Sequence, residues 1–384
     1  MFWAAEAPNK SKTFMKTETD KTKVAIVHDW LYGGGAEKVV LALHQMYPDA
    51  PIYTSYCTKQ WQEKLNNKVV TGYLNKWPFN KIRKFIPFLR IWWFENLDLS
   101  KYDLIISSSG AEAKGVKKLK PGAVHVNYCH APTHYYWSRY NEYIKQPGFG
   151  IFNPIARLGL KILVGPLRKW DFKAAQRPDY LIANSTHIQN QIKKYYKRDS
   201  IVIHPPVMVE KFIPKKLNNS KKSGLVISGR QVPYKRIDLA IRAAIKTKKQ
   251  LSVIGKGPLH NNLVKLAADS QYISFYTNIS DNELVTILQN AELFVFPGVE
   301  DFGIAPVEAL AAGTPVVAYK KGGALDYITN NNGVFFETQN VNELSNAINK
   351  SLQKKYSSQE ISNSSLNFSE KNFKEKISEF LNTV

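Results

Sequence analysis

The stretch that decides the fold is residues 295–309, which read VFPGVEDFGIAPVEA. The segment Leu293–Phe296 at its start has the continuous apolar character of a buried strand, and it runs into a loop with two carboxylates and a glycine. We expect a helix to start around Ala305–Pro306, because proline suits the first helical position, where its missing N–H would have had no partner. A strand end, an exposed loop and a helix N-terminus therefore converge.

This convergence predicts a site for a phosphate-bearing ligand. The N–H groups and the dipole of a helix N-terminus attract an anion, and we expect Glu308 in the first helical turn, where a negative side chain is favoured. Glu300 and Glu308 flank the loop and can accept hydrogen bonds from sugar or ribose hydroxyls. Taken alone, the same residues are equally consistent with ordinary surface charges, since short motifs produce false positives.

The composition limits the class of protein. A chain of 384 residues predicts two domains or slightly more. Its net charge of +22, from 53 Lys and Arg against 31 Asp and Glu, predicts an anionic partner such as a membrane surface, nucleic acid or a phosphorylated substrate. The two cysteines, Cys57 and Cys129, offer no disulfide framework and fit a reducing compartment.

The hydropathy of the chain predicts whether it contains membrane-spanning or leader segments. The sequence contains no apolar run of about 18 residues, so we expect no membrane-spanning helix. We interpret residues 1–21 as a disordered leader, because their short apolar start is too brief for the core of a signal peptide. Met15 is a second candidate for the natural start of the chain.

Two further ligand sites are predicted in the first half. The apolar strand Val24–Val27 leads to a glycine loop containing Gly34 and Gly35 and then to an amphipathic helix. Such a loop lets backbone N–H groups approach a phosphate, although a tight turn without a ligand is the alternative. Another strand is predicted in the run Val124–Pro132, and His130 lies just past it, at the position where ligands gather in open α/β sheets.

Aromatic and basic side chains interleave across residues 75–100, a combination that favours the surface of an anionic membrane. The residues predicted to contact membrane or acceptor are Lys81, Arg83, Lys84, Arg90, Trp92 and Trp93. A helical pair with the aromatic side chains in its core is an equal alternative, and a nucleic-acid surface is less favoured. A second basic, apolar stretch at 148–173 could join the first as one surface.

The second half repeats the alternation of strands and helices. A polar, lysine-rich segment at 215–223 is the predicted linker, and the apolar strand 225–228 follows it. Arg230 and Lys235 come next, five residues apart in a loop before a helix, and two cations there suit a diphosphate; a solvated cationic loop is the alternative. The alternation predicts parallel sheets with helices on both faces.

Together these motifs resemble the retaining glycosyltransferases of family 4. The motifs are Gly33-Gly34-Gly35-Ala36-Glu37, His130-Ala131-Pro132-Thr133, Arg230 with Lys235, Gly255-x-Gly257-Pro258, Glu300 with Glu308, and Gly313-Thr314-Pro315-Val316-Val317-Ala318. The run at Glu300–Gly303 is most similar to bacterial mannosyltransferases of polysaccharide and O-antigen assembly. The resemblance covers residues 23–382.

The resemblance implies an α/β fold of the GT-B type, with two Rossmann-like parallel-sheet domains facing a central cleft. It implies an acceptor-side domain at residues 22–206, a nucleotide-sugar domain at 207–366, and a final helix at 367–384 that crosses back to the first domain. The implied catalytic residues are His130, Arg230, Lys235 and Glu300. The implied donor-binding residues are Gly34, Gly35, Thr277, Phe302, Gly303, Ile304 and Glu308.

The resemblance also implies a reaction: transfer of mannose from GDP-mannose to a lipid-linked or saccharide acceptor in cell-surface polysaccharide biosynthesis, at the cytoplasmic face of the membrane. We expect transfer without a metal ion, because the sequence has no D-x-D motif and no cluster of metal ligands. We also expect no cofactor and no nucleic-acid partner. Thr277 stands where relatives commonly have glycine, so a UDP- or ADP-sugar donor stays open. A non-catalytic basic binding protein and an epimerase are the less favoured alternatives.

Overall fold

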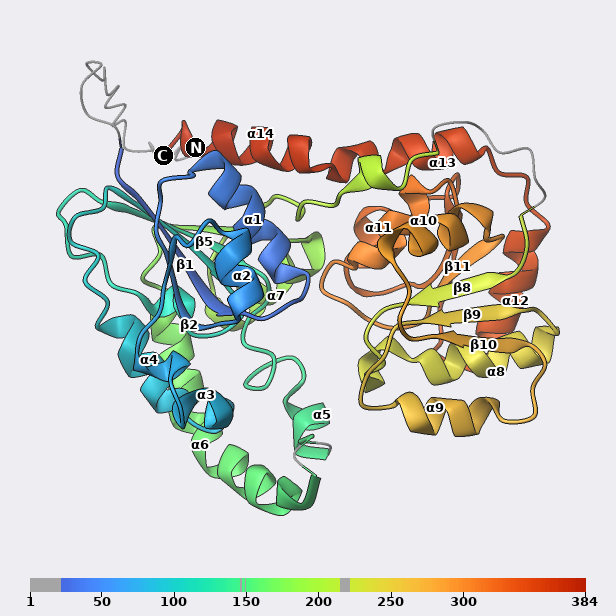
Figure 1. The fold of residues 1–384 in the computed structure, drawn as a ribbon, viewed down its shortest axis with the longest axis horizontal. Helices are drawn as coiled ribbons and strands as arrows, with labels where there is room; N and C mark the ends of the chain where they lie inside the picture. The colour runs from blue at the N-terminus through green and yellow to red at the C-terminus, as the bar shows by residue number, and fades with distance from the viewer. Residues whose placement is uncertain (1–21, 146, 149, 215–221) are drawn as a thin grey trace, which may run out of the picture.

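The computed structural model describes residues 22–384 except 146, 149 and 215–221. The leader predicted at residues 1–21 and most of the linker predicted at 215–223 lie outside the described residues. Figure 1 shows two α/β lobes side by side, with the end of the chain running across the top from the second lobe back to the first. The two lobes face each other across the middle of the molecule, and this arrangement positions the site.

The first lobe is built on a seven-stranded sheet with the order β3-β2-β1-β4-β5-β6-β7, and its neighbouring strands are parallel. Its strands are β1 Val24–Leu31, β2 Ile52–Cys57, β3 Val69–Val70, β4 Leu104–Ser109, β5 Val124–Cys129, β6 Tyr180–Ala183 and β7 Ile201–Val202. The strand order reverses between β1 and β4. In open parallel sheets, ligands bind beyond the carboxyl ends of the strands at such a reversal.

Helices cover both faces of this sheet, which explains the continuous apolar runs in its strands. The helices are α1 Ala36–Met46, α2 Lys59–Lys64, α3 Phe79–Ile82, α4 Pro87–Glu95, α5 Tyr140–Lys145, α6 Asn153–Ala174 and α7 Thr186–Tyr196. Successive residues of β1 point to opposite faces. Ile26 packs in the cluster with Val40 of α1, whereas Val27 packs in the cluster with Phe94 of α4.

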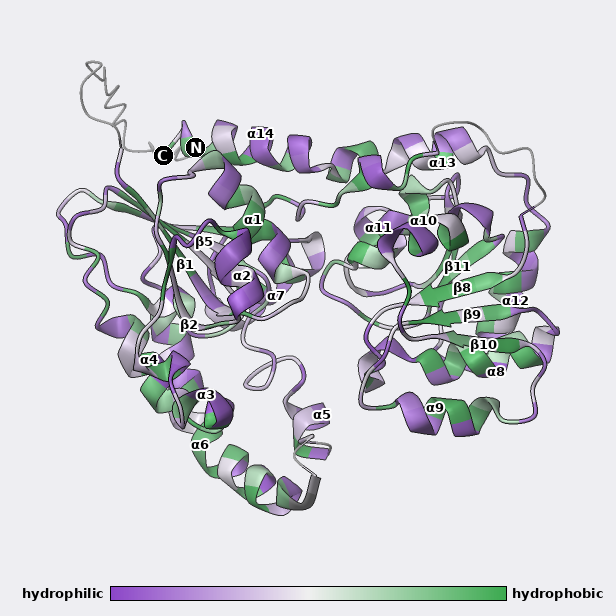
Figure 2. Cartoon of the chain, in the orientation of Figure 1, coloured by the Kyte–Doolittle hydropathy of each residue, from purple (hydrophilic) through white to green (hydrophobic). Residues whose placement is uncertain are grey.

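The second lobe is built on a six-stranded parallel sheet with the order β10-β9-β8-β11-β12-β13. Its strands are β8 Leu225–Ser228, β9 Leu251–Ile254, β10 Ile273–Tyr276, β11 Leu293–Phe296, β12 Val316–Tyr319 and β13 Gly333–Phe336. Its helices are α8 Ile237–Thr247, α9 His260–Ala267, α10 Asp281–Asn290, α11 Ile304–Ala311 and α12 Val341–Leu352. Figure 2 shows the hydrophobic strands of this sheet. The predicted α/β class with two parallel sheets is confirmed.

The end of the chain joins the lobes. Helix α13 (Ser358–Ser364) lies on the second lobe, and helix α14 (Glu370–Leu381) lies against the first (Figure 1). The ring of Phe373 packs against Tyr128 of β5, with ring centres 5.8 Å apart. Ser369 caps the start of α14, because its hydroxyl accepts a hydrogen bond from the Asn372 N–H at 3.2 Å. The second lobe is therefore held by two crossings of the chain.

Two local predictions differ from the structure. Helix α11 begins at Ile304, before the predicted Ala305–Pro306. Its N-cap is Gly303, whose φ of 96° is a conformation that glycine adopts without strain. Glu308 consequently lies in the second helical turn rather than the first. Strand β1 also continues beyond the predicted Val27, and it carries His28 and Asp29 toward the cleft.

Candidate active site

A cavity of about 880 Å³ lies between the two lobes. Its walls are the loops that follow the strands of both sheets. Residues that come directly after or soon after a strand and line the cavity include Gly34, Gly110, His130, Gly229, Gly255 and Glu300. The cavity therefore occupies the position that the strand order predicts for a ligand in a doubly wound sheet, once in each lobe.

A lysine–glutamate pair lies in the second-lobe wall. Lys235 ends the short 3₁₀ turn before α8, and its Nζ donates a hydrogen bond to the carboxylate of Glu300, in the loop after β11. Burial opposes the charge on Lys235, but attraction to Glu300 outweighs it and raises the lysine pKa. A Cβ on Gly229 would lie 2.7 Å from this Nζ, so glycine leaves room for the ammonium group. The wall thus holds a protonated amine beside a carboxylate.

The N-terminus of α11 faces the same cavity. Phe302, Gly303, Ile304 and Glu308 line it, and Glu308 forms a 3.0 Å ion pair with Lys38 of α1 in the first lobe. Helix N-termini attract anions.

The glycine loop of the first lobe lies opposite. Gly34 and Gly35 line the cavity, and a Cβ on Gly35 would come within 2.9 Å of the Ile304 side chain. Glycine at position 35 therefore permits the close approach of the two lobes. The carboxylate of Glu37 accepts the Gly33 N–H at 2.8 Å, so this loop donates at least one of its N–H groups internally.

A second set of contacts joins the lobes at Asp301. His134 Nε2 lies 2.8 Å from Asp301 Oδ2, and Arg139 donates to the Val299 carbonyl at 3.1 Å. Burial would raise the pKa of Asp301, but His134 and Arg139 outweigh it and lower the pKa to about 2. The Arg139 guanidinium also lies 4.1 Å from the ring centre of Tyr234. The loop that carries Glu300 is therefore held from the first lobe.

Two histidines of the first lobe, His130 and His28, form part of the cavity wall. His130 Nε2 is 2.7 Å from the Ser108 hydroxyl, and burial lowers the pKa of His130 to about 3, so its ring is neutral near pH 7. His28 Nδ1 lies 2.7 Å from the Ser108 carbonyl. Because a carbonyl only accepts, His28 Nδ1 carries a proton and donates it in this hydrogen bond. Both rings line the cavity.

Sequence reasoning missed several cavity residues. His28 and Asp29 were overlooked, although both follow an apolar run, which is the signal that identified His130. Asp29 accepts hydrogen bonds from the backbone N–H groups of Gly110, Ala111 and Ala113 at 2.7–2.9 Å. It therefore fixes the loop after β4 beside the cavity. Lys38 and Arg139, which reach across the cleft, carried no signal, because their partners are far away in the sequence.

The structure brings most of the predicted catalytic and donor-binding residues together. Those that line the cavity are His130, Lys235, Glu300, Gly34, Gly35, Thr277, Phe302, Gly303, Ile304 and Glu308. Arg230 is not among the lining residues; it is exposed, directly after Gly229, which does line the cavity. The individual roles of these residues stay predictions.

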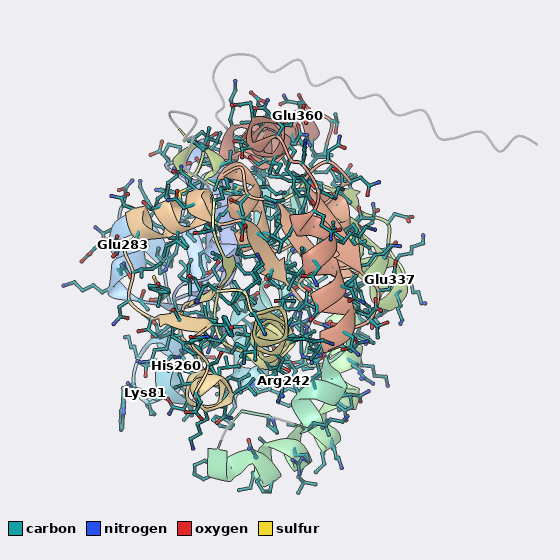
Figure 3. All side chains as sticks on the ribbon, turned by 90° about the vertical axis from the view of Figure 1, so that its right-hand side faces the viewer. Lys81, Arg242, His260, Glu283, Glu337 and Glu360 are labelled. Carbon is teal, nitrogen blue, oxygen red and sulfur yellow. The ribbon has the colours of Figure 1, made fainter. Side chains whose placement is uncertain are left out.

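The predicted membrane residues divide into two groups. Lys81, Lys84 and Trp92 are exposed, and Lys81 projects from the edge of the molecule in Figure 3. Arg83 is half-buried, with its guanidinium 4.0 Å from the ring centre of Tyr56. Their contact with a membrane stays a prediction.

The prediction is wrong for Arg90 and Trp93, because both are buried. Arg90 forms a bidentate pair with Glu112, at 2.7 and 3.2 Å. Trp93 packs with Phe94 in the core of the first lobe. Both residues belong to the inward face of α4, so neither can contact a bilayer or an acceptor directly.

The described residues contain no group of three or more His, Cys, Asp or Glu side chains that could hold a metal ion. Within the same part of the chain, no helix combines the length and the apolar character that a bilayer crossing requires.

Comparisons with known proteins cover both lobes. The model of Glycosyltransferase Family 4 matches residues 33–211, and the model of Glycosyl transferases group 1 matches residues 208–371. The alpha-1,3/1,6-mannosyltransferase ALG2 of Saccharomyces cerevisiae is 27% identical over an alignment of 378 residues, and the match covers 81% of this chain and 72% of that protein.

A second relative is a GDP-mannose-dependent monoacylated alpha-(1-6)-phosphatidylinositol monomannoside mannosyltransferase of Corynebacterium glutamicum. It is 32% identical over 135 residues, but the match spans only 32% of this chain and 35% of that relative.

Solved structures share the architecture. The crystal structure of Anabaena Alr3699/HepE in complex with UDP has a TM-score of 0.66 at 18% identity, with 94% of this chain and all of that chain covered. The structure of WaaG, a glycosyltransferase involved in lipopolysaccharide biosynthesis, has a TM-score of 0.63 at 15% identity, with 93% and 99% covered. These likenesses concern the fold alone, and they confirm the predicted arrangement of two facing Rossmann-like lobes.

Proposed function

The chain belongs to the glycosyltransferases of family 4, and from that premise we propose that it is a retaining mannosyltransferase that uses GDP-mannose. The observation that carries the proposal is the ion pair of Lys235 with Glu300, in a cavity between two lobes and beside the N-terminus of α11. A sugar nucleotide needs both kinds of group side by side: a fixed cation for the diphosphate and a carboxylate for sugar hydroxyls. Two of the relatives bear the name mannosyltransferase.

Lys235 is proposed to bind the donor diphosphate. Its raised pKa keeps the amine charged, and a diphosphate oxygen competes with Glu300 for it. Glu300 is then free to accept hydrogen bonds from hydroxyls of the transferred mannose. Arg230 directly follows Gly229, which lines the cavity, and its side chain is exposed. We propose that it adds a second, solvent-exposed cation to this side of the site. Preorganised positive groups stabilise the charge that develops on the leaving group.

The transfer step conserves the configuration at the anomeric carbon. The acceptor oxygen forms a bond to that carbon on the face from which the GDP oxygen departs, and the hydroxyl proton passes to the leaving diphosphate. Lys235 and the α11 N-terminus stabilise the negative charge on GDP. His130 donates or accepts a hydrogen bond near the sugar as a neutral ring, since its pKa of about 3 excludes a permanent charge near pH 7.

The second carboxylate is proposed to recognise the nucleoside. Glu308 lies in α11, opposite Lys38, and a ribose that donates two hydroxyl hydrogen bonds can replace that ion pair. Thr277, in the loop after β10, lines the cavity and is proposed to face the nucleobase. We propose transfer without a metal ion, because Lys235 and the helix N-terminus supply positive charge at the diphosphate.

The acceptor is proposed to be a lipid-linked or soluble saccharide of cell-surface polysaccharide assembly, met at the inner face of the cell membrane. The net charge of +22 supports a location at an anionic surface. A second candidate keeps the reaction and changes the donor to a UDP-sugar. It is favoured by Thr277 at the predicted base pocket and by the UDP-glucose complex of the HepE structure.

The test is a turnover assay with the purified full chain. GDP-mannose and a polyprenyl-diphosphate saccharide are supplied in buffer with EDTA, and released GDP is measured together with the mannosylated product. The proposal expects GDP release that depends on the acceptor, and an α-linked product. Turnover with UDP-glucose instead of GDP-mannose selects the second candidate. Absence of turnover with GDP-, UDP- and ADP-sugars would overturn the enzymatic proposal.

A further inference from the structure

The outward side of α6 has an unusual distribution of side chains. Ile155, Leu158 and Ile162 are 71%, 60% and 64% exposed. They are spaced three and four residues apart, so they form one stripe along the helix. In a surface helix of a globular protein the apolar stripe normally faces the core. Here an apolar stripe faces outward, along the half of α6 that extends below the rest of the lobe in Figure 1.

The inward side of the same helix is already occupied. Leu167 packs with Ile91 of α4 and with Tyr136, and the Trp170 Nε1 donates to Glu95 of α4 at 2.8 Å. Figure 2 shows hydrophobic segments along the whole length of α6. The exposed stripe is therefore additional to the face that attaches α6 to the lobe, and the packing of α6 within the chain does not explain it.

Lysines accompany the stripe on the same side. Lys161, Lys169 and Lys173 are exposed, and Lys169 lies seven residues after Ile162, which is two helical turns along the same face. We call the exposed residues Ile155, Leu158, Lys161, Ile162, Lys169 and Lys173 the docking face. Apolar groups for insertion and ammonium groups beside them are thus combined on one side of one helix.

The helix that packs against α6 also carries exposed apolar side chains. Helix α4 packs beside α6 through Ile91 and Leu167. Phe85, Phe88 and Trp92, in and before α4, are all exposed, and Trp92 is exposed by 57%. Exposed lysines at 81 and 84 accompany them. Aromatic rings of this kind sit at the depth of lipid headgroups.

We propose that the docking face of α6, continued by these aromatic side chains, binds the first lobe to the surface of an anionic lipid bilayer. The inference deepens the proposed membrane location, but it rests on the surface of α6 and not on the transfer chemistry. An anionic bilayer complements both properties of the face, since lipid takes up the apolar side chains and its charge attracts the lysines. A second copy of the chain would instead bring like charges together.

The buried side of α6 contacts the loop that forms one wall of the cleft. Asp171, on the buried side of α6, accepts hydrogen bonds from Thr133 and Trp137 at 2.7 Å. His134 and Arg139, in the same loop, are the residues that contact the second lobe. Docking through α6 therefore holds the acceptor-side wall of the cavity close to the bilayer, where a lipid-linked acceptor is anchored.

The test is co-sedimentation of the full chain with vesicles of phosphatidylglycerol and phosphatidylcholine, and with vesicles of phosphatidylcholine alone. The triple variant Ile155→Ser, Leu158→Ser, Ile162→Ser is expected to lower the partition coefficient at least tenfold. The matched control replaces three exposed aliphatic residues outside the first lobe, as Ile245→Ser, Val264→Ser and Leu366→Ser, and is expected to bind like the wild type.

A charge variant tests the lipid class. Lys161→Glu, Lys169→Glu and Lys173→Glu together are expected to abolish the preference for phosphatidylglycerol, whereas Lys246→Glu, Lys265→Glu and Lys350→Glu on the second lobe keep it. Thermal unfolding checks that each variant is folded. Unchanged binding of a folded docking-face variant would overturn the proposal, as would self-association of the wild type that the serine variant abolishes. GDP release with a soluble acceptor tests the proposed reaction separately from membrane binding, so failure of one proposal can be distinguished from failure of the other.

Discussion

At the scale of the residue, the cavity is defined by charges that are paired across short distances. Lys235 pairs with Glu300 within the second lobe, and Glu308 pairs with Lys38 across the cleft. Each carboxylate thus has one cationic partner that a ligand can replace. Both carboxylates are thereby compensated, and the pairing explains how the partly buried amine of Lys235 stays protonated although burial alone would lower its pKa.

The first prediction concerns Lys235. Lys235→Ala removes the cation that stabilises the departing diphosphate, so kcat should fall by about 10²- to 10³-fold. Arg230→Ala should cost less, because the exposed side chain of Arg230 interacts through solvent. The matched control is Arg242→Ala, an exposed cation of α8 that Figure 3 labels, with wild-type kinetics expected. Steady-state GDP release measures all three, and a Lys235→Ala enzyme with normal kcat would refute the role.

The second prediction concerns Glu308. Glu308→Gln keeps the shape of the side chain but weakens its hydrogen bonds to the ribose. Because the ribose does not react, binding in the ground state and in the transition state should suffer equally. KM for the sugar nucleotide should therefore rise by about tenfold or more, with kcat little changed, since hydrogen bonds to charged groups contribute about 1.5–3 kcal/mol. A fall in kcat at constant KM would assign Glu308 to the chemical step instead.

At the scale of the element, the sequence predicts strands better than helix ends or faces. The apolar runs Leu225–Ser228 and Leu293–Phe296 are strands with the predicted bounds, because parallel strands covered on both sides must be apolar throughout. The start of α11 depends on the backbone of Gly303, which the apolar pattern does not report. Helix α4 is apolar on its inner and outer sides, so its periodicity could not separate buried Trp93 from exposed Trp92.

Long-range partners limited the prediction of the site in the same way. The sequence around Arg90 is that of a surface cation, because its partner Glu112 is 22 positions away and is brought into contact only by the fold. Lys38 and Glu308 are separated by 270 positions in the sequence, and no local pattern connects them. The strand-end positions of His130 and Glu300 were predictable, since a parallel sheet gathers such residues at one edge. Which side chains reach across the cleft was not.

The third prediction concerns the sheet of the first lobe. His125 in β5 is fully buried, and burial lowers its pKa from 6.5 to about 3. Between these values the unfolded chain binds a proton that the folded chain excludes. The stabilisation is therefore complete above pH 6.5 and is lost as the pH falls from 6.5 toward 3, at up to about 1.4 kcal/mol per pH unit for one such group.

His125→Gln should remove this contribution. Denaturant unfolding at pH 7 and pH 5 measures it as a difference of differences, because His130 and His187 also have lowered pKa values and remain in the variant. The loss of stability between the two pH values should be smaller in His125→Gln than in the wild type. An equal loss would contradict the lowered pKa, because it would mean that His125 binds protons as readily in the folded chain as in the unfolded chain.

At the scale of the whole molecule, the two lobes are joined in two ways. The backbone crosses between them on one side, and side chains connect them across the cleft. The backbone segments that cross between the lobes lie together, with the Val207 N–H bonded to the Phe368 carbonyl at 2.9 Å. At the cleft, His134 contacts Asp301, and the N-terminus of α7 is held by Asp326 of the second lobe through the Thr186 N–H at 2.8 Å. Residues of both lobes therefore line the cavity in which a donor would bind.

The most direct measurement is the thermal unfolding of the wild type and of Lys235→Ala, each with GDP, UDP or ADP in buffer with EDTA. A ligand that binds the folded protein at 100 times its Kd stabilises it by about 2.7 kcal/mol. We predict that GDP raises the Tm of the wild type by several degrees, more than UDP or ADP does, and that Lys235→Ala loses this shift. A wild-type Tm that none of the three nucleotides changes, or an equal GDP shift in Lys235→Ala, would contradict a nucleotide-diphosphate site at Lys235.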